Sequence, residues 1–122
     1  MKSIAQYAME NSSVNILIIT YSYESKLYLE DIILRKSNAH PFSTYISFPN
    51  GSEIYVHSIN SNILNSNILN IIKKIHGESL DMVLFDTRLS EYECENIVRA
   101  LPAHMFASRK GRDDFFQKIE IK

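Results

Sequence analysis

Two apolar runs in the sequence have the pattern of strands that are covered on both faces. Residues 14–20 are an almost unbroken series of aliphatic, mostly β-branched side chains, and residues 81–86 form a shorter apolar run that ends in Asp86. Continuous apolar runs of this length, bounded by polar residues, are typical of buried strands in parallel sheets. We therefore expect both runs to be central strands of one sheet.

A β-hairpin is predicted between these two strands. Residues 44–48 and 53–59 alternate between apolar and polar side chains, and Pro49-Asn50-Gly51-Ser52 lies between them. Asn-Gly is a strong hairpin signal because both residues tolerate a positive φ. A third short strand is expected at residues 103–107, and an edge strand at 119–122.

Helical patterns separate the predicted strands. We expect helices at residues 4–9, 24–36, 90–101 and 113–118, the last no more than a turn or two. His40-Pro41 predicts a break after the second of these helices. That helix offers an apolar stripe formed by Leu27, Tyr28, Ile32, Ile33 and Leu34. The third helix opens with a capping box, Ser90 to Glu93, and is expected to bury Cys94, Ile97, Val98 and Leu101.

Strands that alternate with helices predict an α/β fold. The expected arrangement is a mainly parallel sheet between two layers of helices, with the antiparallel hairpin attached. Residues 61–70 repeat a Ser-Asn-Ile-Leu-Asn motif and are expected to form a polar loop or frayed helix leading into residues 71–75. No linker interrupts the pattern, so residues 1–122 are interpreted as a single domain.

The composition narrows the classes of function. The formal net charge is −1, which does not favour non-specific DNA binding driven by bulk charge. The single cysteine, Cys94, rules out an internal disulfide framework. No apolar run is long enough to cross a bilayer, and the first residues lack the apolar core of a signal peptide. These features favour a cytoplasmic protein with no membrane partner.

Several segments, in this order, resemble the ATPase domain of viral large terminase subunits, the motors that package DNA into procapsids. Met1-Lys2-Ser3 is similar to the end of a Walker A motif, and Asp86 to the aspartate of Walker B. The other similar segments are the strand end and helix that begin at residue 20, the Asn-Gly-Ser hairpin at 48–54, the loop at 76–79 and a coupling-motif-like stretch at 107–116.

The resemblance implies a reduced P-loop-NTPase-like fold in which Lys2, Ser3 and Asp86 are vestigial nucleotide-binding residues. In an intact motor the aspartate holds Mg²⁺ and a following glutamate activates water. Here Thr87 follows Asp86, and a hydroxyl is too weakly basic for that role. The glycines that would cradle phosphates before Lys2 are missing, since the whole chain has three glycines. No catalytic residue, no bound cofactor and no nuclease domain are therefore expected.

Each candidate residue also has a purely structural interpretation. Asp86 at a strand end is more often the cap of the following turn than a magnesium ligand, and we favour the cap. Glu78, in the loop at 76–79, is interpreted as solvated rather than as a substitute base. Arg109, Lys110 and Arg112 form a basic loop that is a candidate contact for phosphate or for a protein partner, although Asp113 and Asp114 offset its charge. The four histidines lack the spacing of a metal site, so no metal centre is expected.

The sequence therefore favours a non-catalytic, terminase-like viral or satellite protein that acts by protein–protein binding and modulates DNA packaging. Its expected partner is a packaging motor or a capsid component. One alternative is an ATPase completed by a partner chain, in which Asp86 holds Mg²⁺ and ATP is the substrate. The other is a small nucleic-acid-binding module that uses the basic loop.

Overall fold

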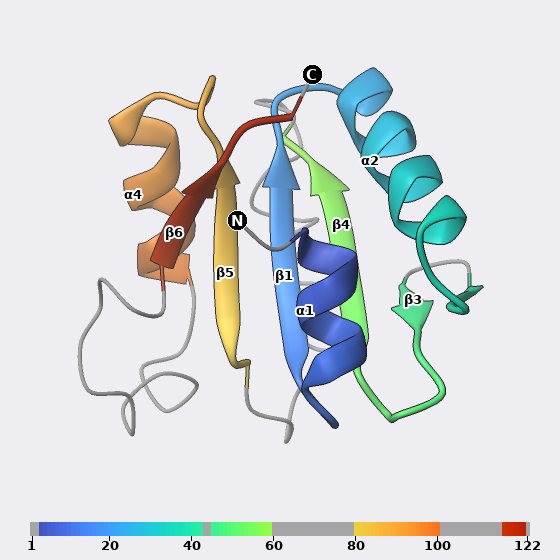
Figure 1. The fold of residues 1–122 in the computed structure, drawn as a ribbon. Helices are drawn as coiled ribbons and strands as arrows, with labels where there is room; N and C mark the ends of the chain where they lie inside the picture. The colour runs from blue at the N-terminus through green and yellow to red at the C-terminus, as the bar shows by residue number, and fades with distance from the viewer. Residues whose placement is uncertain (1–2, 43–44, 60–79, 101–115, 122) are drawn as a thin grey trace.

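The computed structural model describes residues 3–42, 45–59, 80–100 and 116–121, and these residues form an open mixed β-sheet with helices packed on it (Figure 1). Its helices are α1 (Ile4–Glu10), α2 (Tyr23–Arg35) and α4 (Glu91–Ala100). Its strands are β1 (Asn15–Thr20), β2 (His40–Pro41), β3 (Ile46–Ser47), β4 (Glu53–Ser58), β5 (Met82–Asp86) and β6 (Phe116–Ile119). Across the sheet the order is β2-β3-β4-β1-β5-β6.

The direction of the strands confirms a mainly parallel sheet with an antiparallel hairpin. Strand β1 pairs in parallel with β4 on one side and with β5 on the other, and β6 continues the parallel part beyond β5. Strands β2 and β3 are antiparallel to their neighbours. From β1 the chain moves to β4, returns to the other side of β1 as β5, and continues outward to β6 (Figure 1). The order therefore reverses between β1 and β5, which is a topological switch point.

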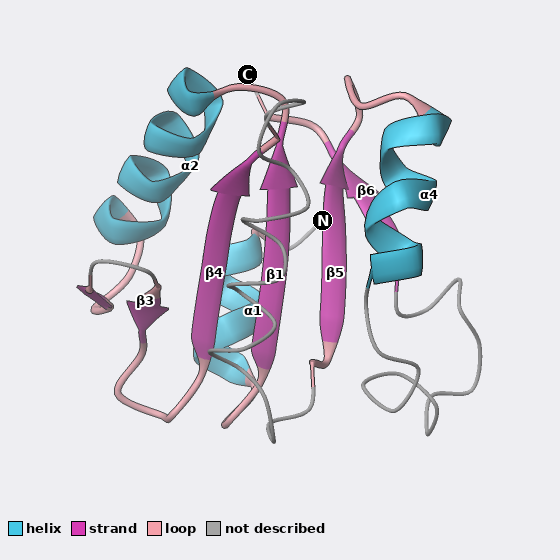
Figure 2. Ribbon diagram, turned by 180° about the vertical axis from the view of Figure 1, so that it is seen from behind, coloured by secondary structure: helices cyan, strands magenta, loops and turns pink. Residues whose placement is uncertain are grey.

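Helices cover both faces of the sheet. Successive side chains of β1 point to opposite faces, so apolar side chains lie on both faces and pack with helices there. Ile16 and Ile18 pack with the buried side chains of α1 and α2, whereas Leu17 and Ile19 pack with Ile97 of α4. Figure 2, seen from behind, shows α4 in front of the sheet and α1 beyond it. These four side chains of β1 are each at most 1% exposed, as the unbroken apolar run predicts.

The hairpin is confirmed, but its turn differs from the tightest Asn-Gly type. Phe48 N donates to the Ser52 carbonyl at 2.8 Å and Gly51 N to the Phe48 carbonyl at 3.0 Å, which leaves a three-residue loop. Gly51 has a φ of +90°, whereas Asn50 does not have a positive φ. Asn50 is held instead by its side chain, which donates to the carbonyls of Ala8 and Met9 at 2.8 and 3.1 Å. The loop therefore fastens the carboxyl end of α1.

The capping box at the start of α4 is confirmed. Ser90 N donates to Glu93 Oε1 at 3.0 Å, and Glu93 N donates to Ser90 Oγ at 3.1 Å. Further along α4, Ile97 and Val98 are buried as predicted, and Cys94 is partly buried.

The predicted apolar stripe of α2 is wrong in its first turns. Leu27 and Tyr28 are each 47% exposed, and Ser25, Leu29 and Ile33 are the buried side chains of this helix. Residues 27 and 29 lie about 200° apart around a helix, so they cannot share one face. The face formed by Ser25, Leu29 and Ile33 packs on the sheet. Leu34 is partly buried against the same core, whereas Leu27 and Tyr28 are exposed.

The expected break after α2 is confirmed, since the helix ends at Arg35, and His40–Pro41 forms the short edge strand β2. The helical turn expected at 113–118 is wrong where the structure describes it, because Phe116–Ile119 is a strand. Val83 lies opposite Phe116 and Asp86 opposite Ile119, so pairing with β5 fixes the conformation of β6. The edge strand accordingly ends at Ile119 instead of beginning there. The strand at 103–107, Leu101 and the segments at 61–70 and 71–75 lie outside the described residues.

Candidate functional site

Asp86 lies at the carboxyl edge of the sheet, next to the switch point. It is the last residue of β5, and β1 and β5 run in parallel with Ile19 opposite Phe85. Ligands of open α/β sheets bind in the crevice at such a point, outside the carboxyl ends of the strands. The structure therefore confirms the expected place of Asp86 at the carboxyl end of a parallel strand.

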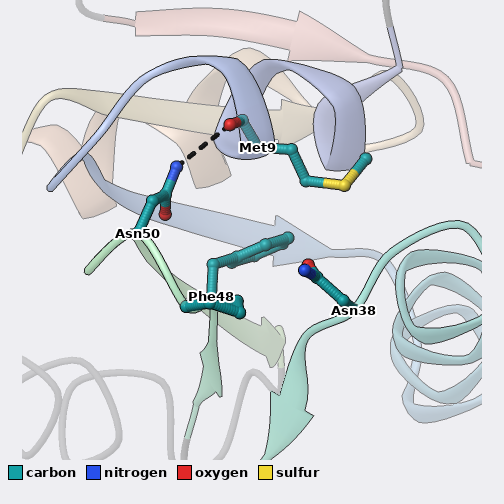
Figure 3. A pocket seen from close by; sticks show the side chains of 5 residues that line it. Met9, Asn38, Phe48 and Asn50 are labelled. Carbon is teal, nitrogen blue, oxygen red and sulfur yellow. Dashed lines mark hydrogen bonds between the residues drawn. The ribbon is translucent and has the colours of Figure 1, made fainter.

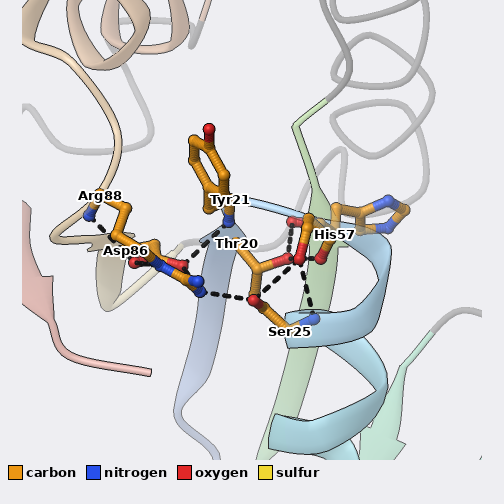
Figure 4. A network of polar contacts seen from close by, with 7 residues as sticks. Thr20, Tyr21, Ser25, His57, Asp86 and Arg88 are labelled. Atoms are coloured by element: carbon orange, nitrogen blue, oxygen red, sulfur yellow. Dashed lines mark hydrogen bonds and ion pairs between the residues drawn. The ribbon is translucent and has the colours of Figure 1, made fainter. Parts of the chain in front are cut away.

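The carboxylate of Asp86 is fully buried and accepts four hydrogen bonds from within the chain (Figure 4). Oδ1 accepts from Arg88 N at 3.0 Å and from Arg88 Nε at 3.1 Å. Oδ2 accepts from Tyr21 N at 3.0 Å and from Arg88 Nη2 at 2.8 Å. Both oxygens are thus engaged, and the buried charge is neutralised by the guanidinium.

Arg88 connects three elements at this edge. The guanidinium pairs with Asp86 at the end of β5, and its Nη2 also donates to Ser25 Oγ in the first turn of α2. Its centre lies 5.1 Å from the ring of Tyr21, which follows β1, in a cation–π contact. The Arg88 side chain is 44% exposed, so one side of the guanidinium reaches solvent.

The loop from β1 to α2 is tied by hydroxyl groups. Thr20 Oγ1 donates to the Ser22 carbonyl at 3.0 Å, and the His57 carbonyl lies within reach of the same hydroxyl at 3.4 Å. Ser22 caps α2 by accepting from Ser25 N at 3.1 Å, and the two serine hydroxyls are 2.9 Å apart. His57 thus contributes its backbone carbonyl, and not its side chain, to these contacts. The hydroxyls hold the start of α2 against the ends of β1 and β4.

The surroundings of Asp86 lower its pKa. Burial alone would raise the pKa of this carboxyl, but hydrogen bonds from the Arg88 side chain and backbone and from the Tyr21 amide, with the Arg88 charge, outweigh burial. The same contact with Asp86 raises the pKa of Arg88, against a smaller effect of desolvation. The pair is therefore ionised throughout the neutral range.

The residues around Asp86 do not fit a Mg²⁺ ion. A hard cation needs several oxygen ligands with lone pairs that converge on it. Here both carboxylate oxygens already accept hydrogen bonds, and a permanently charged guanidinium lies against them. The geometry instead matches the favoured interpretation of Asp86 as the cap of the turn that follows β5.

The other nucleotide-binding candidates do not join this cluster. Ser3 Oγ accepts from Gln6 N at 3.1 Å and caps α1, and in the described part of the chain it makes no hydrogen bond with Asp86. Thr87 is exposed, and its amide donates to the Ile119 carbonyl at 3.0 Å. Lys2, Glu78 and the basic residues Arg109, Lys110 and Arg112 lie outside the described residues. Within the described ranges, no group of three or more histidine, cysteine, aspartate or glutamate residues is placed to hold a metal ion.

Sequence reasoning missed Arg88, Ser25 and Tyr21. A local signal existed for Arg88, because an aspartate commonly accepts the amide of the residue two positions later in a turn. Ser25 and Arg88 are 63 positions apart, so only the fold brings them together.

A small hollow lies near the carboxyl end of α1. Met9, Asn38, Phe48, Pro49 and Asn50 line a shallow hollow of about 140 Å³ (Figure 3). Of its two asparagines, Asn50 donates its side-chain N–H groups to the carbonyls of Ala8 and Met9 in α1. The hollow is too small for a nucleotide.

Comparison of the sequence with protein families and with curated proteins finds no match. Among the helices of the described residues, none has both the length and the apolar character needed to span a bilayer.

Proposed function

We propose that this chain is a non-catalytic relative of the terminase ATPase domain and acts by binding a protein, a packaging motor or a capsid component in the cytoplasm of an infected cell. The observation that carries the proposal is that both carboxylate oxygens of Asp86 are already engaged in hydrogen bonds. Within the described part of the chain, its two oxygens accept hydrogen bonds from Tyr21 and Arg88. A Walker B aspartate engaged in this way has no lone pairs directed at a magnesium ion.

The fold is compatible with a reduced P-loop-like arrangement. Helix α1 begins directly after Ser3, where the resemblance places the helix that follows the Lys-Ser pair. Strands β1 and β5 are parallel neighbours, and the candidate Walker B residue ends β5 at the carboxyl edge. These features support a backbone fold shared with the terminase ATPase domain. The engagement of both Asp86 oxygens in hydrogen bonds argues against nucleotide turnover.

The exposed side chains of α2 support a binding role. Tyr23 and Leu27 are 63% and 47% exposed and lie one helical turn apart, so they share a face of the helix. Tyr28 is 47% exposed but lies about 140° around the helix from Tyr23, and Tyr21 precedes the helix with 50% exposure. Exposed apolar and aromatic side chains that gather on one surface mark sites of protein interaction, and tyrosine is enriched in such sites. Lys26 is paired with Glu30, and Arg88 with Asp86, so the cations near this surface are locally neutralised. An apolar protein surface therefore suits it better than a phosphate backbone.

Affinity capture with mass spectrometry from infected cells tests the proposal. The tagged full-length chain is expected to recover a packaging or capsid protein, and Tyr23→Ser with Leu27→Ser is expected to reduce that recovery at least tenfold. Tyr92→Ser is the matched control, because Tyr92 is 75% exposed on the other helix layer. Recovery of no packaging or capsid protein by the unaltered chain would count against this function.

The alternatives give different results in the same preparation. An ATPase completed by a partner requires nucleotide binding that depends on Mg²⁺ and on Asp86. A nucleic-acid module that uses Arg109, Lys110 and Arg112 requires DNA affinity that falls steeply with salt.

A further inference from the structure

The side of α2 that is turned away from the sheet carries an apolar strip along most of the helix. Tyr23, Leu27 and Leu34 fall within about 40° of one another around the helix axis. Tyr23 and Leu27 are exposed, and Leu34 is partly buried against the core. The strip lies about 140° around the helix from the middle of the face that packs on the sheet, so a second helix can reach it.

A row of polar side chains follows one flank of this strip. Glu24, Asp31 and Arg35 lie within about 80° of Leu27 around the helix, and Tyr28 lies about 100° from it. Asp31 and Arg35 form an exposed ion pair with an Oδ2–Nε distance of 3.0 Å. Glu24 is exposed, and within the described ranges its carboxylate has no ion-pair partner. The row therefore begins with a free carboxylate and ends with an exposed guanidinium.

We propose that α2 pairs with α2 of a second copy of this chain, in antiparallel orientation about a two-fold axis. Such an axis places the same flank of both helices side by side, so the polar row meets its own reverse. Glu24 and Arg35 lie at equal distances from the midpoint between residues 29 and 30, and so do Tyr28 and Asp31. With the axis at that midpoint, Glu24 of each copy lies opposite Arg35 of the other, and the Tyr28 hydroxyl lies opposite the Asp31 carboxylate.

The same register also interlocks the apolar strip. Leu34 of one copy comes level with the gap between Tyr23 and Leu27 of the other, which is how side chains of adjacent helices interdigitate. On the opposite flank, Lys26 pairs with Glu30 at 2.9 Å within each helix, so these charges are neutralised before the helices meet. The apolar and the charged contacts agree on one arrangement, and this self-complementarity favours a second copy as the occupant.

A dimer held by one helix of each copy is expected to be weak. Contacts of this size fall at the low end of specific interfaces, so we expect a dissociation constant of about 0.1 mM. The second copy covers the surface assigned above to a packaging partner, so the dimer is the state of the free chain that such a partner displaces. The inference does not rest on that partner, because the purified chain alone tests it.

Sedimentation equilibrium of the purified chain, from about 10 µM to about 1 mM, tests the inference together with two charge reversals. Glu24→Arg and Arg35→Glu each place like charges opposite one another, so either variant alone is expected to raise the dissociation constant roughly tenfold or more. An equimolar mixture of the two variants restores opposite charges at both contacts. We expect the mixture to form a heterodimer about as tightly as the unaltered chain dimerises.

Glu95→Arg is the matched control, because it makes the same change in net charge on the exposed side of α4 and is expected to leave the dimer intact. Circular dichroism checks that each variant keeps its helices. The inference is overturned if the unaltered chain stays monomeric at about 1 mM, if either reversal alone leaves the dimer intact, or if the mixture does not associate.

The two proposals fail separately. A monomeric chain that still recovers a packaging protein, and loses it with Tyr23→Ser and Leu27→Ser, would show that the surface serves a foreign protein and would overturn the self-pairing. A dimeric chain that recovers no packaging or capsid protein would support the self-pairing and count only against the proposed function.

Discussion

At the scale of single residues, the buried carboxylate of Asp86 joins the end of β5 to Tyr21, which follows β1, and to Arg88. Asp86 is fully buried yet ionised, because it accepts hydrogen bonds from two backbone amides and from a guanidinium. Hydrogen bonds to a charged group are worth roughly twice as much as those between neutral groups. The residue therefore contributes to stability through its charge.

This arrangement predicts a pH dependence of stability. The folded state lowers the pKa of Asp86 below its ordinary value of 3.8. Its stabilisation is thus fully present above the unfolded pKa and is lost as the pH falls through the folded pKa. Asp86→Asn is expected to reduce the unfolding free energy by about 2 kcal/mol near neutral pH. In urea unfolding, the gap between variant and unaltered chain is expected to narrow as the pH falls below the ordinary range of a carboxyl group.

Asp31→Asn is the matched control for that experiment. Asp31 pairs with Arg35 on the exposed side of α2, where its side chain is 54% exposed. Surface pairs of this kind contribute roughly 0.5 kcal/mol or less. A loss for Asp31→Asn as large as for Asp86→Asn would contradict a special role for the buried carboxylate.

The role of Asp86 as a turn cap was predictable from sequence, whereas its main partners were not. An aspartate that ends an apolar strand and precedes a turn carries a local signal, because its own chain neighbours supply the donors. Arg88 is the counter-ion because its side chain points back toward the Asp86 carboxylate after the turn, and a sequence pattern does not record that direction. The contact with Ser25 depends on how α2 is placed, which no local pattern records.

At the scale of elements, the hairpin loop has a second role as the clamp of α1. Asn50 donates to the carbonyls of Ala8 and Met9, and Ser52 Oγ donates to the Asn11 carbonyl at 2.5 Å. These carbonyls belong to the end of a seven-residue helix, which is too short to be stable alone. The Asn-Gly-Ser segment therefore stabilises an element far from it in sequence.

Asn50→Ala is expected to lower the unfolding free energy by about 1–2 kcal/mol, because the carbonyls at the end of α1 lose their donor. Asn38→Ala serves as the control: Asn38 lines the same hollow but is exposed. Chemical denaturation of the two variants checks the difference. Equal losses would show that the hollow, and not the clamp, is responsible.

Gly51→Ala is expected to cost about 1–2 kcal/mol, since Gly51 has a φ of +90°. A Cβ there would also lie 3.0 Å from Ser13 Oγ. Adding Ser13→Ala removes that contact but not the backbone strain. In equilibrium unfolding, the double variant is therefore expected to recover only part of the loss, and full recovery would assign the whole effect to the hydroxyl.

Elements with continuous apolar or alternating patterns were predicted well, and those fixed by distant pairing were not. The run at residues 14–20 identifies β1 because burial on both faces leaves no polar positions. Strand β6 is short and lies at the sheet edge, and its conformation depends on β5, which is more than twenty residues away in sequence. The exposed side of α2 was misassigned because Leu27 and Tyr28 are apolar without contacting the core.

At the scale of the whole molecule, the α/β class and the mixed sheet followed from the sequence, whereas the strand order did not. Alternation of strands and helices indicates parallel crossovers but does not say on which side of β1 each later strand lies. The reversal between β1 and β5 is the switch point next to which Asp86 lies. At this point the Asp86 carboxylate accepts hydrogen bonds from Tyr21 and Arg88.

Because both oxygens of Asp86 are engaged by Arg88 and Tyr21, the purified chain is expected not to bind ATP in a Mg²⁺-dependent way. Titration with a fluorescent ATP analogue is expected to show no saturable binding in the micromolar range, with or without Mg²⁺. Asp86→Ala is expected to leave that result unchanged. Micromolar binding abolished by Asp86→Ala would instead favour the partner-completed ATPase.

The core beneath α1 and α2 also has a consequence for how the protein is made. Among the described residues, Leu84 and Ile121 are the only buried side chains of this core that come from the chain after residue 59. A nascent chain therefore holds most of that core before β5 leaves the ribosome, and we expect compaction to start there. The contacts that join Asp86, Arg88 and Ser25 can form only after translation has passed β5, so they are absent from any chain that terminates before Arg88.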